Sequence, residues 1–288
     1  LFILFACFSS VLLLILLTYI NNRALKKYPV SATISSVFVG DSHVQLGIND
    51  QYLVNSINLA GPGESIYYTF YKLGSILINN PSIRKVYVGF SYHSVSSYVN
   101  DNIYGSRSKD IAPRYFLILP FREKITMIKH NRNNLPPFFR NIFRNGFRTI
   151  FAKNNKFSFI GGYENNFRKT ASLKESIDKR IAQQYYDKGE LRDYSFININ
   201  YLQKIIELCK KRNVELIVLN IPIHSYYKSR IPQKFIDKYN AIIQNNNLKQ
   251  EGFDTSLLSD SCFIADGDHL SELGALMTTT ELRKRIIP

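Results

Sequence analysis

The sequence predicts an α/β fold: a three-layer sandwich with a parallel sheet of about five strands, preceded by one transmembrane helix. Two observations lead to this prediction. Short β-branched segments alternate with segments of helical periodicity, and the first twenty residues are almost continuously apolar. The chain has 288 residues, of which 45% are hydrophobic and 20% charged, so it can build one large α/β domain or two small ones. Disorder as the dominant state is excluded.

The N-terminal segment, residues 1–20, has no charged residue and is long enough to cross a hydrocarbon core of about 30 Å. A cleaved signal peptide usually has an apolar region of about 7 to 15 residues that ends in small residues. Here Asn21 and Asn22 follow instead, and Cys7, which loosely resembles a lipoprotein cleavage site, has most of the apolar segment after it. We therefore predict a transmembrane anchor over residues 1–20 and a juxtamembrane linker over residues 21–32.

The remaining residues, 33–288, alternate between strand and helix patterns. Strands are predicted from apolar runs bounded by turn residues, and helices from apolar residues that recur every three or four positions. In chain order we expect a strand over 33–39, a short apolar segment over 53–60, a helix around 66–77, a strand over 84–90, a helix from about 201 to 213, a strand over 214–220, a helix around 235–243, a weak strand over 252–257 and a closing helix over 271–287. This order predicts a parallel sheet with helices on both faces.

An insertion interrupts the alternation at about residues 92–195 and is rich in Asn, Arg and Phe. Its most regular part pairs a phenylalanine series with an arginine series: Phe139, Phe143, Phe147 and Phe151 beside Arg140, Arg144 and Arg148. A helix with an aromatic and a basic side is typical of a membrane interface, where it would dock the domain or shape access to a site. The alternative is an ordinary amphipathic helix whose Phe side packs on the domain. Gly146 weakens the helix prediction.

The charge balance restricts the partners. Lys+Arg 37 against Asp+Glu 22 gives a formal net charge of +15, which suits nucleic acid, anionic lipid or an acidic envelope polymer. The sequence contains no recognised nucleic-acid-binding module, so we predict no nucleic-acid partner. The three cysteines, Cys7, Cys209 and Cys262, lack C-x-x-C spacing, which excludes a metal knuckle and a dense disulfide framework.

Two motifs carry candidate catalytic residues. Ser42 follows the first predicted strand directly, which places its hydroxyl at the C-terminal edge of the sheet, where ligands of open α/β sheets bind. Asp266 precedes His269 by three residues, so its carboxylate can fold back on the imidazole and hold the tautomer. Taken alone, the first motif could be a simple turn and the second a surface hydrogen bond.

In this order and spacing, the Gly-Asp-Ser and Asp-x-x-His motifs and the alternation between them resemble the SGNH or GDSL hydrolase superfamily. The resemblance runs from about Ile34 to Arg285 and is interrupted by the insertion. It implies that Ser42 is the nucleophile, that His269 is the general base and acid, and that Asp266 orients His269. It implies no cofactor.

The same resemblance implies an oxyanion hole. The Ser42 amide and a glycine of the family's second block would bind the oxyanion, and in Gly61-Pro62-Gly63 the better match is Gly63. The third block departs from the family, because Gly89-Phe90-Ser91 stands where Gly-x-Asn is usual. Losing one donor costs about 3 to 4 kcal/mol of transition-state stabilisation. Ser91 or His93 could substitute, or the site could be slow or inactive.

Such departures resemble membrane-anchored SGNH-like proteins that serve acyl transfer to envelope polymers, including alginate acetylation and D-alanylation of teichoic acids. We therefore predict a serine esterase or O-acyltransferase that acts on an acylated cell-envelope glycan, on the periplasmic side of a bacterial inner membrane. Its partners would be the glycan or an acyl donor, the membrane through residues 1–20, and an acyl-donating membrane protein. Arg23, Lys26 and Lys27 after the anchor favour the opposite orientation.

Two other functions stay open: a lipid esterase that uses the insertion as a membrane-facing lid, and a non-catalytic scaffold or binding protein. A metal site is not predicted. His93 and His224 each follow a predicted strand and could join Asp266 and His269 at one sheet edge, but no two of them share a helix at metal-ligand spacing.

Overall fold

The computed structural model describes residues 2–152, 156–165 and 173–286. Its central sheet has five parallel strands in the order β2-β1-β3-β6-β7. The strands are β1 (Ser36–Val39), β2 (Ser56–Asn58), β3 (Lys85–Gly89), β6 (Glu215–Leu219) and β7 (Lys249–Glu251). The predicted fold class is confirmed. In this doubly wound order the connections leave β1 and β3 in opposite directions, so the crevice at their C-terminal ends is the expected ligand site.

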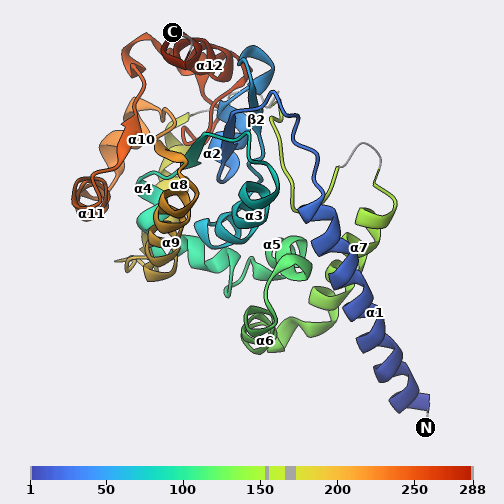
Figure 1. Cartoon of the computed structure of the whole chain (residues 1–288). Coiled ribbons are helices and arrows are strands. Elements are labelled where there is room, and N and C mark those ends of the chain that lie inside the picture. The colour runs from blue at the N-terminus through green and yellow to red at the C-terminus, as the bar shows by residue number, and fades with distance from the viewer. Residues whose placement is uncertain (1, 153–155, 166–172, 287–288) are drawn as a thin grey trace.

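Helices cover both faces of the sheet because side chains alternate along each strand. Val37 and Val39 of β1 enter one core, whereas Phe38 enters the other and stacks on Tyr87 of β3 with ring centroids 4.5 Å apart. The first core packs against α3 (Ile66–Asn79), α9 (Phe196–Arg212) and α11 (Gln233–Asn245), and the second against α2 (Ser42–Gly47) and α12 (Glu272–Ile286). Figure 1 shows these two layers on either side of the sheet.

The last strand departs from the prediction. The weak strand expected over 252–257 is wrong: β7 ends at Glu251, and Thr255–Leu257 form a single 3-10 turn. β7 is an edge strand of three polar residues, paired with β6 from Ile217↔Lys249 to Leu219↔Glu251. Backbone pairing and ion pairs of Lys249 and Glu251 hold it in place, so no apolar alternation marks it in the sequence.

The insertion is mostly helical. Its elements are α4 (Tyr92–Val95), the 3-10 helix η2 (Ser97–Asn102), α5 (Ser108–Tyr115), η3 (Phe116–Ile118), α6 (Phe121–His130), η4 (Arg132–Asn134), α7 (Leu135–Ile150), α8 (Leu173–Tyr185) and the antiparallel pair β4 (Tyr186–Asp187) and β5 (Glu190–Leu191). The predicted Phe-Arg helix is α7. Gly146 does not break this helix. A Cβ there would lie 2.9 Å from Leu17 Cδ1, so the glycine lets the N-terminal helix approach closely.

The N-terminal helix, α1, spans Phe2–Lys26 and therefore continues past residue 20 into the predicted linker. In the described part of the chain it is the one helix long and apolar enough to cross a membrane. Its first half projects from the domain, and its second half lies against α7 (Figure 1). There Leu17 and Leu25 are buried, and Asn21 Oδ1 accepts a hydrogen bond of 2.6 Å from Thr149 Oγ1.

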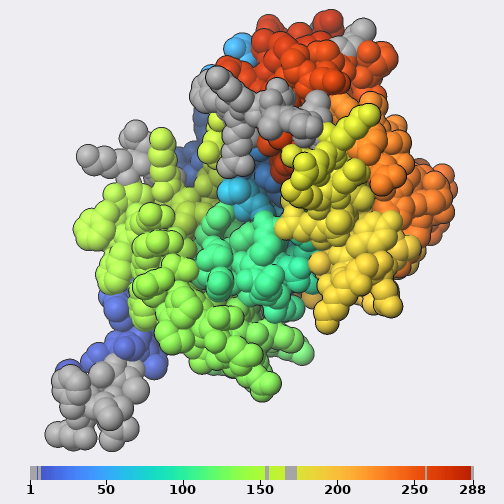
Figure 2. Space-filling view, turned by 180° about the vertical axis from the view of Figure 1, so that it is seen from behind, coloured from blue at the N-terminus to red at the C-terminus, as the bar shows by residue number. Residues whose placement is uncertain are grey.

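The surface beside α1 belongs to the insertion, whose green residues surround the base of the blue helix in Figure 2. On α7, Phe139 and Phe143 are half-buried, whereas Phe147 and the C-cap residue Phe151 are exposed. The Phe side thus packs on the domain at its first half only. Cys7 lies among the residues whose side chains the structure does not describe, and Cys209 and Cys262 are buried free thiols.

Candidate active site

Ser42 lies at the C-terminal end of β1, as the sequence predicts. Gly40 follows the strand with φ +135°, and a Cβ there would lie 3.1 Å from the Gly89 backbone of β3, so the two strands need a glycine at this position. Asp41 then caps helix α2 by accepting the His43 N–H at 2.9 Å. This turn presents Ser42, the first residue of α2, at the crevice between β1 and β3.

His269 and Asp266 complete a linear set of hydrogen bonds with Ser42. The Oγ of Ser42 lies 2.7 Å from His269 Nε2, and His269 Nδ1 lies 2.8 Å from Asp266 Oδ2. The other Asp266 oxygen accepts the backbone N–H groups of Asp268 and His269, which folds the loop back on itself as Asp-x-x-His spacing predicts. The structure thus brings together the three side chains that the sequence singles out, and their catalytic roles stay a prediction.

The environment keeps Asp266 ionised. Burial acts to raise the pKa of Asp266, but the hydrogen bond and charge of His269 outweigh it, so the pKa lies below its ordinary value. An ionised carboxylate at this position holds the imidazole with Nε2 directed at the serine hydroxyl.

Gly63 lines the same cavity as Ser42. Its φ of +69° is a left-handed conformation, and a Cβ there would lie 2.3 Å from Ile111 Cδ1, so this loop requires glycine. The adjacent Glu64 anchors the loop through a fully buried ion pair of 2.5 Å with Lys72, whose Nζ also donates to the Leu59 carbonyl. Gly61, the weaker match in the sequence, lines the neighbouring cavity instead.

Ser91 does not turn toward Ser42. Its side chain caps α4 and lies 3.0 Å from His93 Nδ1, and it is not among the residues that line the cavity beside Ser42. His93 does line that cavity, but both of its ring nitrogens have partners, Ser91 and Asp41. The prediction that Ser91 supplies an oxyanion donor therefore stays a prediction without a supporting contact.

Asn102 lines this cavity, and the sequence analysis did not identify it. It ends η2 and is 5% exposed, and its Nδ2 donates one hydrogen bond of 3.0 Å to the Gly63 carbonyl. Among the described residues, its Oδ1 has no hydrogen-bond partner. An amide group thus stands beside Gly63 with hydrogen-bonding capacity left over.

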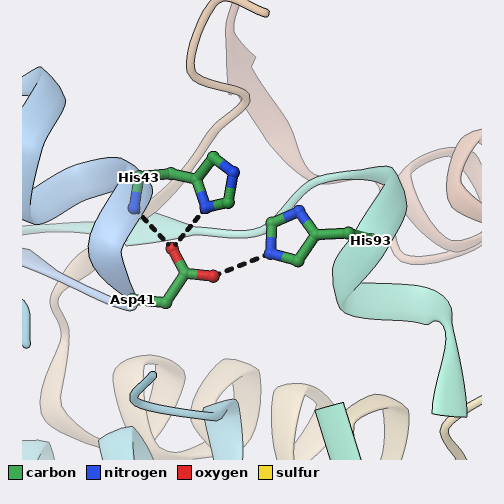
Figure 3. Close-up of side chains that lie close together, drawn as sticks. All are labelled: Asp41, His43 and His93. Carbon is green, nitrogen blue, oxygen red and sulfur yellow. Dashed lines mark hydrogen bonds and ion pairs between the residues drawn. The ribbon is translucent and has the colours of Figure 1, made fainter. Parts of the chain in front are cut away.

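Behind Ser42, three imidazole rings form a stack. His43 lies between His93 and His269, with ring centroids 4.2 Å and 4.5 Å away. Its Nδ1 lies 3.0 Å from Asp41 Oδ1, and its Nε2 lies 2.8 Å from Asp268 Oδ1. The second oxygen of Asp41 bonds His93 Nε2 at 2.7 Å, which Figure 3 shows together with the Asp41–His43 contacts.

The two histidines bonded to Asp41 differ in charge. Burial acts to lower the pKa of His43, but Asp268 and Asp41 outweigh it, and the pKa lies well above its ordinary value. Burial and the charge of His43 together lower the pKa of His93 despite Asp41. At neutral pH, His43 is therefore an imidazolium and His93 is neutral.

Asp268 connects the stack to the insertion. It is fully buried, and its second oxygen accepts Arg180 Nε at 2.7 Å and Gln184 Nε2 at 2.8 Å, both from α8. Burial acts to raise the pKa of Asp268, but His43 and Arg180 outweigh it and hold the pKa well below its ordinary value. We call Asp41, His43, Asp268 and Arg180 the buried ionic layer; its four formal charges sum to zero at neutral pH.

The same side chains have the chemistry of metal ligands. Asp41, His43 and His93 offer ligand atoms within 4.8 Å of one another, and so do His43, Asp268 and His269. In both groups, hydrogen bonds account for the close approach of imidazole and carboxylate. His224, the other histidine considered for a metal site, pairs with Asp260 at 3.0 Å and joins neither group.

An open groove leads away from Ser42. Its first part, about 640 Å³, is lined by Ser42, Gly63, His269 and Asp266 together with Arg107, Arg114 and Arg180. A small pocket of about 40 Å³, lined by Gly63, His93 and Asn102, lies beneath the serine. The site therefore combines a serine hydroxyl that is hydrogen-bonded to an imidazole with a cavity volume suited to a small ligand.

No protein-family model and no curated protein matches the chain. Several solved structures are similar to it. A GDSL-like lipase from Bacteroides thetaiotaomicron is 11% identical with a TM-score of 0.41, and the match covers 90% of each chain. A protein assigned as an acylhydrolase from Bacteroides fragilis is 12% identical with a TM-score of 0.41, covering 92% of this chain and 93% of that one.

A third similar structure, assigned as a platelet activating factor from Streptococcus pneumonia, is 12% identical with a TM-score of 0.39 and covers 99% of this chain and 97% of that chain. At such identities a likeness concerns the fold alone. The resemblance to the SGNH or GDSL hydrolase superfamily therefore rests on the Gly-Asp-Ser and Asp-x-x-His motifs of this chain and on the arrangement of Ser42, His269 and Asp266.

Proposed function

We propose that this protein is a membrane-anchored serine esterase or O-acyltransferase of the SGNH type that acts on an acylated cell-envelope glycan. The observation that supports it most directly is the Ser42–His269–Asp266 chain of hydrogen bonds, 2.7 Å and 2.8 Å long, at the sheet crevice. This arrangement joins a nucleophile, a base and an orienting carboxylate, which is the set that acyl transfer through a serine requires.

The reaction begins when Ser42 Oγ attacks the acyl carbonyl carbon and passes its proton to His269 Nε2. Asp266 stabilises the imidazolium that forms. The carbonyl oxygen becomes an oxyanion that accepts hydrogen bonds from the backbone N–H groups of Ser42 and Gly63. The tetrahedral intermediate then expels the alcohol oxygen, which takes the proton from His269, and an acyl-serine remains.

Asn102 is proposed as the third oxyanion donor. The family's asparagine is absent from the segment after β3, and Ser91 at that position is turned toward His93. The Asn102 amide approaches the same cavity from η2, thirteen residues after Gly89, and its Nδ2 has a second proton beyond the one donated to Gly63.

Water or a sugar hydroxyl can resolve the acyl-serine, with His269 removing the proton of the incoming hydroxyl. Water gives hydrolysis and a sugar hydroxyl gives transfer. The groove that leads to Ser42 is open and lined largely by polar and charged side chains, which suits a hydrated glycan better than a fatty acyl chain.

The test is covalent labelling of the full chain in detergent with a fluorophosphonate probe. We expect the wild type to be labelled and Ser42→Ala to remain unlabelled, because phosphonylation needs the activated hydroxyl. Ser229→Ala, at an exposed serine on α10 (Ser225–Arg230), is the matched control and should label like the wild type. An unlabelled wild type would favour a non-catalytic scaffold.

Substrate class is tested with the same preparations. We expect acetate release from an O-acetylated oligosaccharide and none from dioleoylphosphatidylcholine vesicles. The opposite pattern would support the lipid esterase.

The proposed orientation places residues 28–288 outside the cytoplasmic membrane. A cysteine at Lys188, exposed in the turn between β4 and β5, gives a reporter, because Cys209 and Cys262 are buried. We expect a membrane-impermeant maleimide to label Lys188→Cys in intact spheroplasts. Labelling only after lysis would mean that the domain is cytoplasmic, as the basic residues after the anchor favour.

A further inference from the structure

The groove extends beyond the catalytic residues. A second cavity of about 470 Å³ shares Gln45, Pro62 and Arg114 with the cavity that contains Ser42, so the two adjoin. Its far wall is α7, the helix that packs against the anchor α1. One continuous groove thus runs from the serine to the helix beside the anchor.

Three arginines line this second cavity: Arg114 from α5, and Arg144 and Arg148 from α7. Within the described residues, none of the three lies within ion-pair distance of a carboxylate, and Arg114 Nη1 donates only to the Pro62 carbonyl at 2.9 Å. Arg180 in the first cavity differs, since it is paired with buried Asp268. We call Arg114, Arg144 and Arg148 the arginine subsite.

The geometry of α7 directs the two helical arginines to the same place. Arg144 and Arg148 are one turn apart and lie on the same side as Asn141 and Asn145, which line the cavity with them. Arg140 is exposed one turn earlier and does not line it. The helix is fixed from behind, because Gly146 and Thr149 contact α1.

The acidic residues that line the groove are fewer than the arginines. Asp110 lines the second cavity, and Glu164 and Asp266 line the first; Glu164 accepts a hydrogen bond of 3.0 Å from Gln45, and Asp266 holds His269. The second cavity therefore keeps a positive excess, with asparagine and serine side chains beside the guanidinium groups.

We propose that the arginine subsite binds anionic groups, phosphate or carboxylate, on the glycan whose ester is presented to Ser42. A guanidinium group binds both anions through two parallel N–H···O bonds, and unpaired arginines keep these donors available. The polar lining favours a hydrated chain over a lipid tail. The inference rests on the proposed function, because it concerns the substrate of that site: the enzyme would hold a polyanionic envelope polymer in the cavity next to the one that contains Ser42.

Binding is measured on the full chain carrying Ser42→Ala, in nanodiscs of neutral phosphatidylcholine, by calorimetry with two probes: trigalacturonate, a carboxylate, and inorganic triphosphate. We expect Arg144→Gln/Arg148→Gln to weaken the binding of at least one probe about tenfold, because two charged donor groups are removed. The matched control is Arg122→Gln/Arg140→Gln, which removes the same charge from exposed positions of the insertion outside the groove. It should change the affinity less than twofold.

Equal losses in the two double variants would overturn the proposal, because binding would then follow net charge alone. The proposal would also be overturned if Arg144→Gln/Arg148→Gln weakened only the interaction with phosphatidylglycerol added to the nanodiscs and left the affinity for both soluble probes unchanged. The ligand would then be a lipid headgroup. The result is independent of catalysis, since the nucleophile is absent. If the wild type is not labelled by the fluorophosphonate but Arg144→Gln/Arg148→Gln still weakens probe binding tenfold, the proposed chemistry is rejected and the arginine subsite is kept.

Discussion

Charged side chains lie on both sides of Ser42, and the two sides are organised in opposite ways. Behind the serine, every member of the buried ionic layer is paired with an opposite charge at 3.0 Å or less. In front of it, the arginine subsite has no carboxylate partner among the described residues. Charges that hold the loops of Ser42 and His269 in place are neutralised inside the protein, whereas the three arginines of the second cavity remain available to a ligand.

The comparison is tested most strongly by one substitution on each side. Asp268→Asn leaves His43 and Arg180 buried without their shared carboxylate, and we expect the free energy of unfolding to fall by about 3 to 5 kcal/mol. Arg114→Gln should change it by less than about 0.5 kcal/mol, because no ion pair is lost. Urea denaturation of both full-length variants in mild detergent measures the difference. Similar losses for the two variants would mean that the layers do not differ in role.

The pH dependence of stability sharpens the same contrast. Asp41 and Asp268 have pKa values well below the ordinary value near 3.9. Their contribution to the free energy of unfolding is therefore present above about pH 4 and is lost as the pH falls through the lowered pKa. The pKa of His43 lies well above 6.5, so its contribution is complete below about pH 6.5 and is lost as the pH rises through the raised pKa.

The stability that the layer contributes should therefore be greatest between about pH 4 and pH 6.5. The measurement is the difference in melting temperature between the wild type and His43→Gln from pH 4 to pH 9. We expect this difference to shrink toward pH 9. Arg114→Gln should show no such trend, and a difference that grows with pH would contradict the assignment of His43 as an imidazolium.

Asn102 tests whether the cavity behind Gly63 takes part in catalysis. If its Nδ2 binds the oxyanion, Asn102→Ala should lower kcat about 10²-fold, which corresponds to about 2.7 kcal/mol, with little change in KM. Ser91→Ala is the control and should lower kcat less than threefold. A larger effect for Ser91 would restore the assignment that sequence position alone suggested.

The smallest expected effect concerns the two sides of α7. In a Cys7→Ser background, a fluorophore at Phe151→Cys should be quenched by lipid-borne quenchers in nanodiscs about twofold more than one at Arg144→Cys. Phe151 is exposed directly after α7, whereas Arg144 lines the groove. Equal quenching would mean that the arginine subsite faces lipid.

The sequence was sufficient where local patterns decide the structure. Strand alternation predicts β1, β3 and β6, and Asp-x-x-His spacing predicts the contact between Asp266 and His269 because both lie in one loop. The same patterns do not predict the edge strand β7, because its residues are polar and do not alternate with apolar ones.

Sequence patterns cannot predict contacts between segments that are far apart in the chain. His43 and Asp268 are 225 residues apart, and Arg180 comes from an insertion that has no family pattern to align. Asn102 gives no local signal either, since only the fold of η2 brings its amide to Gly63. The arginine series was visible in the sequence, but helical periodicity could not tell that Arg144 and Arg148 line a groove while Arg140 does not.

The attachment of α1 to α7 limits how far the domain can move relative to its N-terminal helix. A flexible tether would let the domain sweep a wide volume around its anchor point. Here the helix continues without a break to Lys26, and Asn21 and Asn22 are fastened to Thr149 and the Leu117 carbonyl. In the proposed topology, Ser42 therefore stays at a nearly constant distance from the bilayer surface. Only polymer segments that enter this thin layer of the envelope can be modified.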